Sequence, residues 1–406
     1  MLKILFPRSS DKYERSRFGG ELKEFCDWMC SVGYSKDNIR GHLRRLFTVF
    51  TSARAVRADE ARSSEWLHRT FERYCTCVRL SQHFRGTEHA YIRFLRDQGR
   101  LLASTPSNSP VALLRREYRR YLVEVRGFSR SALGQHQFTV FDFLEHAMSS
   151  ARDIRGMTEV HVERYLVERG KGLTRQSMQH VVAHLRAFLR YAFARGLIDQ
   201  RLDTIDTPRT YRDELPPRAL PWQQVIKLLS SVDQSSKAGL RDYAILHLMA
   251  YYGLRASEIA DLRLDDIDHD ARTCRVRQRK TSSDLLLPLS NRTVNVLRRY
   301  LNRERPDLDH PWLFLRARRP TGGLRNYAVC DVFYKRASQS GLGLDHYSSY
   351  CLRHSFAMRL LQRGVGVKAI GDLLGHRSLE ATCVYLRLDV SALRGVALPL
   401  ARHMAP

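Results

Sequence analysis

Residues 350–385 constrain this chain more than any other stretch, because nearly every side-chain type needed to break a phosphodiester bond occurs within them. Arg353 can direct two N–H donors at the non-bridging oxygens of a phosphate, and His354 and His376 can donate to a phosphate or to a leaving oxygen. Tyr385 lies nine residues after His376 and carries a phenol that could attack phosphorus. The stretch has no cluster of carboxylates suited to a metal. The pattern therefore indicates covalent phosphoryl transfer by protein side chains.

The order of these residues resembles the active-site segment of the tyrosine recombinases, the phage-integrase family. The resemblance rests on Leu352-Arg353-His354-Ser355-Phe356-Ala357, Gly364, Lys368-Ala369-Ile370, Leu374-Gly375-His376, and Thr382 one helical turn before Tyr385. It implies that Tyr385 is the nucleophile, that Arg353 grips the scissile phosphate and that His376 contacts it. His354 would support the site. The competing tyrosines are Tyr334, Tyr347 and Tyr350.

Three upstream residues, Arg255, Glu258 and Lys280, extend the resemblance. Arg255 and Glu258 lie a helical turn apart, so the carboxylate can orient the guanidinium; in the family this arginine grips the phosphate. An ordinary surface salt bridge is the alternative for an isolated pair. Lys280 lies eight residues before Pro288 on an expected hairpin turn, where the family places the lysine that protonates the departing 5′-oxygen. A solvated lysine is the alternative there.

One position departs from the family. A histidine usually lies three residues before the second arginine, and this chain has Tyr350 there. A tyrosine can hydrogen-bond the phosphate or the nucleophile, but it is a poorer proton acceptor near neutral pH. The departure leaves open which group assists Tyr385.

The resemblance implies a complete reaction. The phenolate attacks a DNA phosphate in line, which gives a 3′-phosphotyrosyl link and a free 5′-hydroxyl that later attacks the phosphotyrosine of another strand. The covalent link keeps the bond energy, so we expect neither ATP nor a metal cofactor. The competing interpretations are a type IB topoisomerase, which uses similar residues to relax supercoils, and a DNA-binding relative that has lost catalysis.

The charge of the chain supports a nucleic-acid partner. Its 406 residues carry a formal net charge of +26, which is spread over the whole length. A solvated basic surface is the alternative, but so large an excess repels itself unless a polyanion binds. The candidate DNA contacts are Arg115, Arg116, Arg119, Lys171, Arg175, His180 and Arg186.

The N-terminus does not resemble a signal peptide, and the apolar run at 243–254 is too short to span a membrane, so we expect a cytoplasmic protein with no membrane partner.

Periodicity and proline-rich breaks predict a mainly α-helical chain in three parts. Residues 1–103 form an extra helical module, and residues 104–110 are a candidate linker. Residues 111–205 form a second helical module, which resembles the family's core-binding domain. Residues 218–406 form the catalytic domain, with a small β-hairpin from 274–278 and 285–289. Gly127-Phe128-Ser129 repeats Gly33-Tyr34-Ser35 at an offset of 94 residues, which suggests duplication of the helical module; general similarity among helical bundles is the alternative.

The last 21 residues carry seven leucines and valines, which makes them apolar enough to dock on protein, but too few residues remain to build a core of their own. In the family such a tail packs on a neighbouring protomer, whereas a tail folded back on its own domain is the alternative. The resemblance also implies a homotetramer on two DNA sites during synapsis, with other recombinases or accessory proteins as further partners. The extra N-terminal module suggests an enzyme carried by a mobile element.

Overall fold

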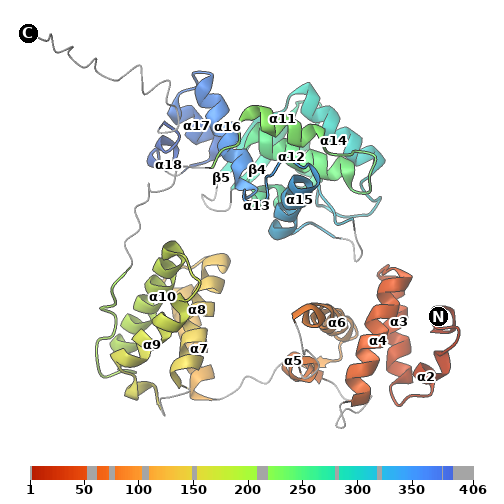
Figure 1. The fold of residues 1–406 in the computed structure, drawn as a ribbon, viewed down its shortest axis with the longest axis vertical. Coiled ribbons are helices and arrows are strands. Elements are labelled where there is room, and N and C mark those ends of the chain that lie inside the picture. Colours follow the sequence, from red (N-terminus) through yellow and green to blue (C-terminus); the bar gives the residue numbers. More distant parts are fainter. Residues whose placement is uncertain are drawn as a thin grey trace, which may run out of the picture. The chain divides into compact units, whose positions relative to one another are not determined.

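The computed structural model describes residues 2–52, 62–72, 78–102, 109–148, 153–207, 218–278, 283–317, 322–376 and 378–386. The chain divides into two compact units, Ala103–Glu214 on the one hand and Met1–Leu102 with Leu215–Pro406 on the other. Both are mainly helical (Figure 1). The predicted fold class is confirmed. Within the described residues, we find no helix with the length and apolar character needed to cross a bilayer.

The N-terminal residues form helices around their own hydrophobic core. Their elements are α1 (Leu2–Leu5), α2 (Ser10–Glu14), α3 (Gly19–Ser31), α4 (Lys36–Ser52), β1 (Arg62–Ser63), α5 (Ser64–Glu72), α6 (Val78–Asp97) and β2 (Leu101–Leu102). Gly33 adopts a φ of 80° between α3 and α4, as the predicted turn requires. The two short parallel strands were not predicted. Arg62 and Glu21 form a buried ion pair at 2.8 Å and share Tyr91 as a hydrogen-bond partner, which satisfies both charges.

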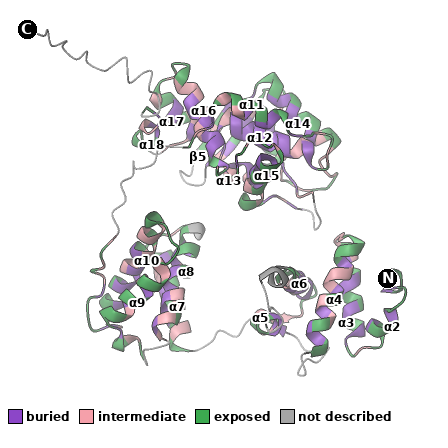
Figure 2. Cartoon of the chain, in the orientation of Figure 1, coloured by how far each residue is buried: buried purple, intermediate pink, exposed green. Residues whose placement is uncertain are grey.

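Ala103–Glu214 is a second helical unit with a separate core. Its elements are α7 (Pro110–Arg120), the π-helix η1 (Tyr121–Val125), α8 (Arg130–Met148), the 3-10 helix η2 (Ile154–Gly156), α9 (Glu159–Gly170) and α10 (Arg175–Ala194). Buried residues line the sides of the helices that face one another (Figure 2). Tyr118 and Phe188 are fully buried in this core. The predicted linker ends earlier than expected. Ser109 accepts a hydrogen bond from Ala112 N as the N-cap of α7 and Pro110 is its first residue, while 103–108 lie outside the described residues.

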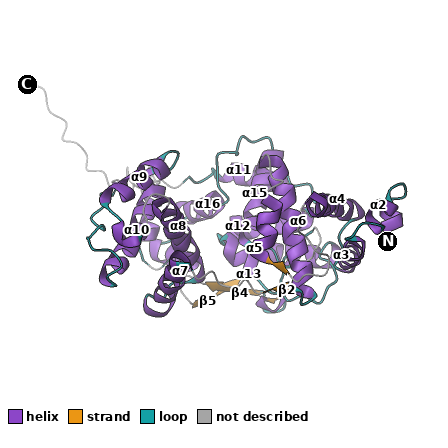
Figure 3. Ribbon diagram, turned by 90° about the horizontal axis from the view of Figure 1, so that it is seen from below, coloured by secondary structure: helices purple, strands orange, loops and turns teal. Residues whose placement is uncertain are grey.

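The C-terminal residues 218–386 combine helices with one small sheet. The elements are α11 (Trp222–Ser230), α12 (Gly239–Tyr252), α13 (Ala256–Asp261), η3 (Leu264–Asp266), β3 (Ile267–Asp268), β4 (Thr273–Gln278), β5 (Ser283–Pro288), α14 (Asn291–Arg303), α15 (Asn326–Gln339), α16 (Tyr350–Gln362), α17 (Val367–Leu374) and α18 (Glu380–Cys383). The sheet is antiparallel in the order β3-β4-β5, with Cys274 opposite Leu287. The strands are a minor element of the fold (Figure 3). The predicted hairpin is confirmed, β3 is an addition, and the turn residues 279–282 lie outside the described residues.

The apolar helix α12 brings the candidate site together. Most of its residues are buried, which explains why residues 243–254 read as a continuous apolar run. Gly253 ends the helix with a φ of 62°, and a Cβ there would lie 2.7 Å from Phe356 and 2.9 Å from Leu374. Only glycine fits this left-handed position without strain or a clash. The turn between α12 and α13 therefore packs directly against α16 and α17.

Candidate active site

Arg353 lies in the first turn of α16 and is almost fully buried, with 2% of its surface exposed. Its Nη1 donates to the carbonyl of Gly253 at 2.6 Å, and its Nη2 donates to the carbonyl of Leu374. Nε has no hydrogen-bond partner among the described residues. A guanidinium has five N–H donors, so two of them hold the fold together while others remain for an anion. Burial, and then the nearby charge of Arg255, lowers the pKa of Arg353.

Arg255 is held in place by Glu258, as the sequence predicted. The carboxylate accepts from Nη1 of Arg255 at 2.6 Å and from its backbone N–H at 2.8 Å, so it also caps the start of α13. Burial lowers the pKa of Arg255, but Glu258 and a hydrogen bond to Tyr350 outweigh this effect and leave it above the ordinary value. The two side chains of the ion pair are only 17% and 6% exposed. The pair is therefore not an ordinary surface salt bridge.

His376 follows the end of α17, where Gly375 adopts a left-handed conformation with a φ of 60°. Its Nδ1 lies 2.7 Å from the Oγ1 of Thr382, a residue that is itself buried. Burial, followed by the charges of Arg353 and Arg255, lowers the pKa of His376 to about 4. The ring is therefore neutral at pH 7. If the Thr382 hydroxyl donates to Nδ1, then Nε2 carries the proton and can donate to a phosphate.

Tyr385 lies just after α18 and is 2% exposed. Its backbone N–H donates to the carbonyl of Thr382, and its Oη lies 3.0 Å from the Nδ1 of His354. Burial raises the pKa of the phenol to about 12, although the charges of Arg353 and Arg255 pull it down. The hydroxyl therefore lies within the electrostatic field of both arginines.

The competing tyrosines have different surroundings. Tyr334 is exposed on α15, and Tyr347 packs against the ring of His346. Tyr350 is 42% exposed, at the start of α16, and its ring meets that of His354 at 4.8 Å, nearly perpendicular to it. Tyr385 is thus the buried tyrosine of this group.

Lys280 lies outside the described residues. The strand that leads to it reaches the site, because the side-chain amide of Gln278, the last residue of β4, lies against Gly375. This contact joins the hairpin to the turn that carries His376. It gave no signal in the sequence.

The candidate DNA contacts lie in the unit Ala103–Glu214. Arg119, Lys171, Arg175, His180 and Arg116 are exposed. Two other candidates use donors inside the unit. Arg115 bonds the carbonyl of Phe141 at 3.1 Å and the carboxylate of Glu145 at 2.6 Å, and Arg186 bonds the carbonyl of Ile205. These two arginines therefore stabilise the helical unit itself.

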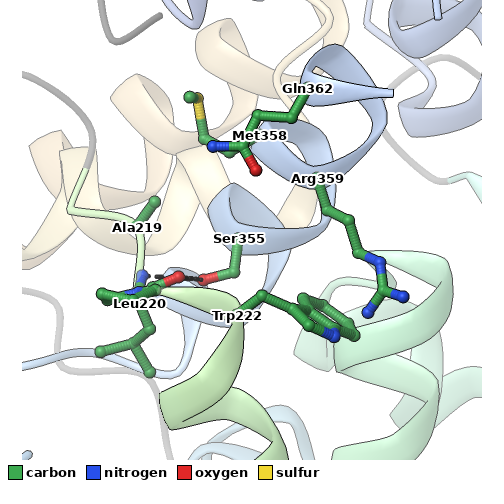
Figure 4. A pocket seen from close by; sticks show the side chains of 8 residues that line it. Ala219, Leu220, Trp222, Ser355, Met358, Arg359 and Gln362 are labelled. Carbon is green, nitrogen blue, oxygen red and sulfur yellow. Dashed lines mark hydrogen bonds between the residues drawn. The ribbon is translucent and has the colours of Figure 1, made fainter. Parts of the chain in front are cut away.

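A hollow of about 330 Å³ lies beside another part of α16 (Figure 4). It is lined by Ala219, Leu220, Pro221, Trp222, Ser355, Met358, Arg359 and Gln362. Ser355 ties the residues before α11 to α16, because its hydroxyl accepts from Leu220 N at 2.8 Å and donates to Leu220 O at 2.9 Å. The guanidinium of Arg359 lies 3.7 Å from the centre of the Trp222 ring. None of the predicted catalytic residues that the structure describes lines this hollow.

Comparison with known proteins agrees with this geometry. Models of the phage integrase family and of the phage integrase N-terminal SAM-like domain match residues 218–391 and 116–196. The tyrosine recombinase XerD of Mycobacterium leprae is 31% identical over 304 residues, which cover 69% of this chain and 93% of XerD. A protein of Sinorhizobium fredii designated y4rF, inferred to be an integrase or recombinase, is 29% identical over 399 residues, 94% of this chain and 91% of its own length.

A solved structure of the site-specific recombinase XerH, bound to its difH substrate, has the same fold. It aligns with a TM-score of 0.55 and 17% identity over 75% of this chain and 92% of XerH. The sequence matches do not favour the topoisomerase or the inactive DNA-binding relative. The chain belongs to the phage integrase family of tyrosine recombinases, enzymes that cleave and rejoin DNA strands.

Proposed function

We propose that Tyr385 is the nucleophile of this recombinase and that Arg255 and Arg353 hold the scissile phosphate between them. The observation that carries the proposal is the position of the Tyr385 hydroxyl, buried and within the field of both guanidinium groups. Two fixed positive charges in a water-poor site stabilise the extra negative charge of a pentavalent phosphorus. His376, neutral and anchored by Thr382, adds a hydrogen bond to the same phosphate.

The reaction follows from these roles. The Tyr385 oxygen forms a bond to phosphorus while the bond from phosphorus to the 5′-oxygen breaks, and the 5′-oxygen takes a proton from Lys280, the general acid that the resemblance implies. The 3′ end of the strand is then joined to the protein. A 5′-hydroxyl from another strand attacks this link and releases the tyrosine. Because the link conserves the bond energy, rejoining needs no ATP.

The partner of this site is double-stranded DNA. A net charge of +26 favours a polyanion, and XerH, which has the same fold, was solved on its DNA substrate. We assign the non-specific contacts of the unit Ala103–Glu214 to its exposed basic residues, Arg116, Arg119, Lys171, Arg175 and His180. Replacing Arg119 and Arg175 with glutamine should make DNA affinity fall less steeply as the salt concentration rises, because fewer counterions are released. Replacing Arg186, which hydrogen-bonds the carbonyl of Ile205, should instead lower the stability of the unit Ala103–Glu214.

Strand exchange between two DNA sites requires four cleavages, and each subunit offers one Tyr385. We therefore propose a homotetramer that works in the cytoplasm, where its DNA substrate lies, and that serves a mobile element. The tail after Tyr385 lies mostly outside the described residues, and its docking on a neighbouring subunit stays a prediction. Deleting residues 391–406 should spare binding to one site but weaken the pairing of two. Wild-type pairing by the truncated protein, measured by sedimentation, would rule out exchange of the tail.

The division of the chain at 103–111 and 205–218 also stays a proposal. It is supported by the separate hydrophobic cores of the N-terminal helices, of the unit Ala103–Glu214 and of residues 218–386. Removal of residues 1–103 should leave a folded and monodisperse protein, because each side of the boundary carries its own apolar core. Aggregation of this fragment would mean that the N-terminal helices cover part of another core.

The direct test of the proposed function uses nicked DNA. The substrates are duplex oligonucleotides that together cover the DNA on both sides of the gene, each with a nick in one strand. Cleavage near the nick releases a short strand that carries the free 5′-hydroxyl, and the loss of this strand prevents rejoining. The wild-type protein should accumulate a covalent adduct on at least one duplex, seen as a slower band in a denaturing gel. Tyr385→Phe should bind that duplex with nearly unchanged affinity and form no adduct, because the change removes one oxygen and no charge. An adduct in this variant would refute the assignment.

A further inference from the structure

We propose that His354 is the general base that removes the proton from the nucleophile. This inference rests on the assignment of Tyr385 proposed above. The Nδ1 of His354 lies 3.0 Å from the Tyr385 Oη, which is hydrogen-bond distance for direct proton transfer. The two ring centres are 5.6 Å apart and the planes are inclined by 60°, so the imidazole edge meets the hydroxyl. His354 thus contacts the reacting atom itself, beyond the supporting role that the sequence suggested.

A base is needed because the phenol is a weak acid in this site. Burial raises the pKa of Tyr385 to about 12, so roughly one molecule in 100,000 would carry a phenolate at pH 7 without assistance. Tyr350 also lies beside the site, in contact with the ring of His354, but a phenol accepts a proton poorly near neutral pH. It is also engaged with Arg255 through a hydrogen bond. Among the residues that the structure describes, His354 is therefore the side chain that can both reach the proton and accept it.

The helix also holds the imidazole of His354 in a fixed orientation. Residues 350 and 354 lie one turn apart on the same face of α16. The ring of Tyr350 meets the ring of His354 at 77° and 4.8 Å, which limits the rotation of the imidazole and keeps its Nδ1 toward Tyr385. Tyr350 thus orients the imidazole toward the nucleophile.

Substrate binding makes His354 a better base. The groups that face it are Tyr350 and Arg353 on its own helix, Tyr385 after α18 and His376 after α17. Burial, and then the charge of Arg353, lowers the pKa of His354 to about 4, so the free site holds a neutral imidazole ready to accept a proton. A phosphodiester bound at Arg353 brings a negative charge, which opposes the effect of the guanidinium and raises the pKa of His354. The imidazole therefore gains basicity when a DNA phosphate is in place.

The proton and electron pairs balance in this step. The O–H bond of Tyr385 breaks, its proton moves to Nδ1 of His354, and the electron pair of the oxygen forms the new bond to phosphorus. The bond from phosphorus to the 5′-oxygen breaks, and that oxygen leaves with its electron pair and is protonated by the general acid of the proposed function. In rejoining, protonated His354 returns its proton to the Tyr385 oxygen as the 5′-hydroxyl attacks.

The test compares single-turnover cleavage of a nicked duplex by His354→Ala, His354→Gln and wild type. His346→Ala, a change at an exposed histidine before the same helix, is the matched control. Loss of a general base should slow adduct formation by about 10²- to 10⁴-fold at pH 7.5 while DNA affinity is kept. The wild-type rate should be flat from pH 6 to 9, whereas the rate of the variants should rise by about tenfold per pH unit, because it then follows the phenolate fraction.

A second measurement separates a base from a merely structural contact. Incorporation of 3,5-difluorotyrosine at position 385 makes the phenol more acidic, so it should restore a large part of the rate to His354→Ala and change the wild-type rate little. A rate within threefold of wild type in both His354 variants would overturn the inference, as would a defect that the fluorinated tyrosine fails to repair. An adduct that forms normally in Tyr385→Phe would refute the nucleophile itself, and with it the role of His354. The pH profile and the rescue experiment therefore test the role of His354, whereas the adduct in Tyr385→Phe tests the proposed nucleophile.

Discussion

Replacing Arg353 with lysine should loosen the protein as well as slow cleavage, because the guanidinium bridges two backbone carbonyls. Nη1 binds the carbonyl of Gly253 at the end of α12, and Nη2 binds the carbonyl of Leu374 at the end of α17. An ammonium is a compact group on a flexible stem and can reach one of these carbonyls but not span both. Since the site around Arg353 is almost closed to solvent, the other carbonyl would lose its partner without gaining water.

The size of the effect follows from this geometry. A buried polar group left without a partner costs about 1–3 kcal/mol. With a factor of ten for each 1.4 kcal/mol, local opening around α12, α16 and α17 should become roughly 5- to 140-fold more frequent. Arg255→Lys is the matched control, because its main partner is the charged carboxylate of Glu258, which an ammonium can still reach. Its effect on opening should be clearly smaller.

Amide hydrogen exchange followed by mass spectrometry measures this opening in the intact protein. Peptides from 239–254 and 350–374 should exchange faster in Arg353→Lys than in Arg255→Lys, while peptides from Ala103–Glu214 should not change. Both variants should cleave DNA poorly, since neither keeps a fork of donors for the phosphate. Exchange at the wild-type rate in Arg353→Lys would mean that the guanidinium does not hold the two carbonyls together.

Three further changes test separate contacts. Gly375→Ala should lower the thermal midpoint more than Gly364→Ala, because both glycines have positive φ but only at Gly375 would a Cβ meet another side chain, that of Gln278; equal shifts in calorimetry would contradict this. The free energy of unfolding should fall as the pH drops from 6.5 toward 4, since burial lowers the pKa of His247 to about 4 and the unfolded chain then binds the proton more readily. His247→Asn should reduce that slope in urea titrations, and an unchanged slope would speak against it. Tyr350→His should keep or raise the cleavage rate, because an imidazole can accept a proton and can still pack its ring against His354, whereas a large loss would mean that the hydrogen bond between the phenol and Arg255 is required.

The sequence alone was sufficient for the parts of the site that have local signatures. Residues 274–278 and 285–289 predicted the hairpin, and the apolar run at 243–254, too short to span a membrane, is part of a buried helix that ends at Gly253. The resemblance implied that Arg353, His376 and Tyr385 belong to one site. In the structure, beside the effect of burial, the charge of Arg353 acts to lower the pKa of both other groups, and their catalytic roles stay a prediction.

Contacts with backbone atoms and between distant segments could not be predicted in this way. The acceptors of Arg353 are carbonyls, which every residue has, so no residue type marks them. A basic residue on an amphipathic helix gives the same pattern whether it meets DNA or bonds within its unit, which is why Arg115 and Arg186 ranked with exposed candidates. The spacing of Tyr350 and His354 placed both rings on one face, but only the path of the chain after α18 decides which ring reaches Tyr385.

The most direct test of the central claim is to identify the residue that carries the DNA. The adduct formed on a nicked duplex can be digested with protease and nuclease, and the modified peptide can be sequenced by mass spectrometry. The account predicts a nucleotide joined through its 3′-phosphate to Tyr385, in the peptide that also contains Thr382. A nucleotide on Tyr334, Tyr347 or Tyr350 would contradict it.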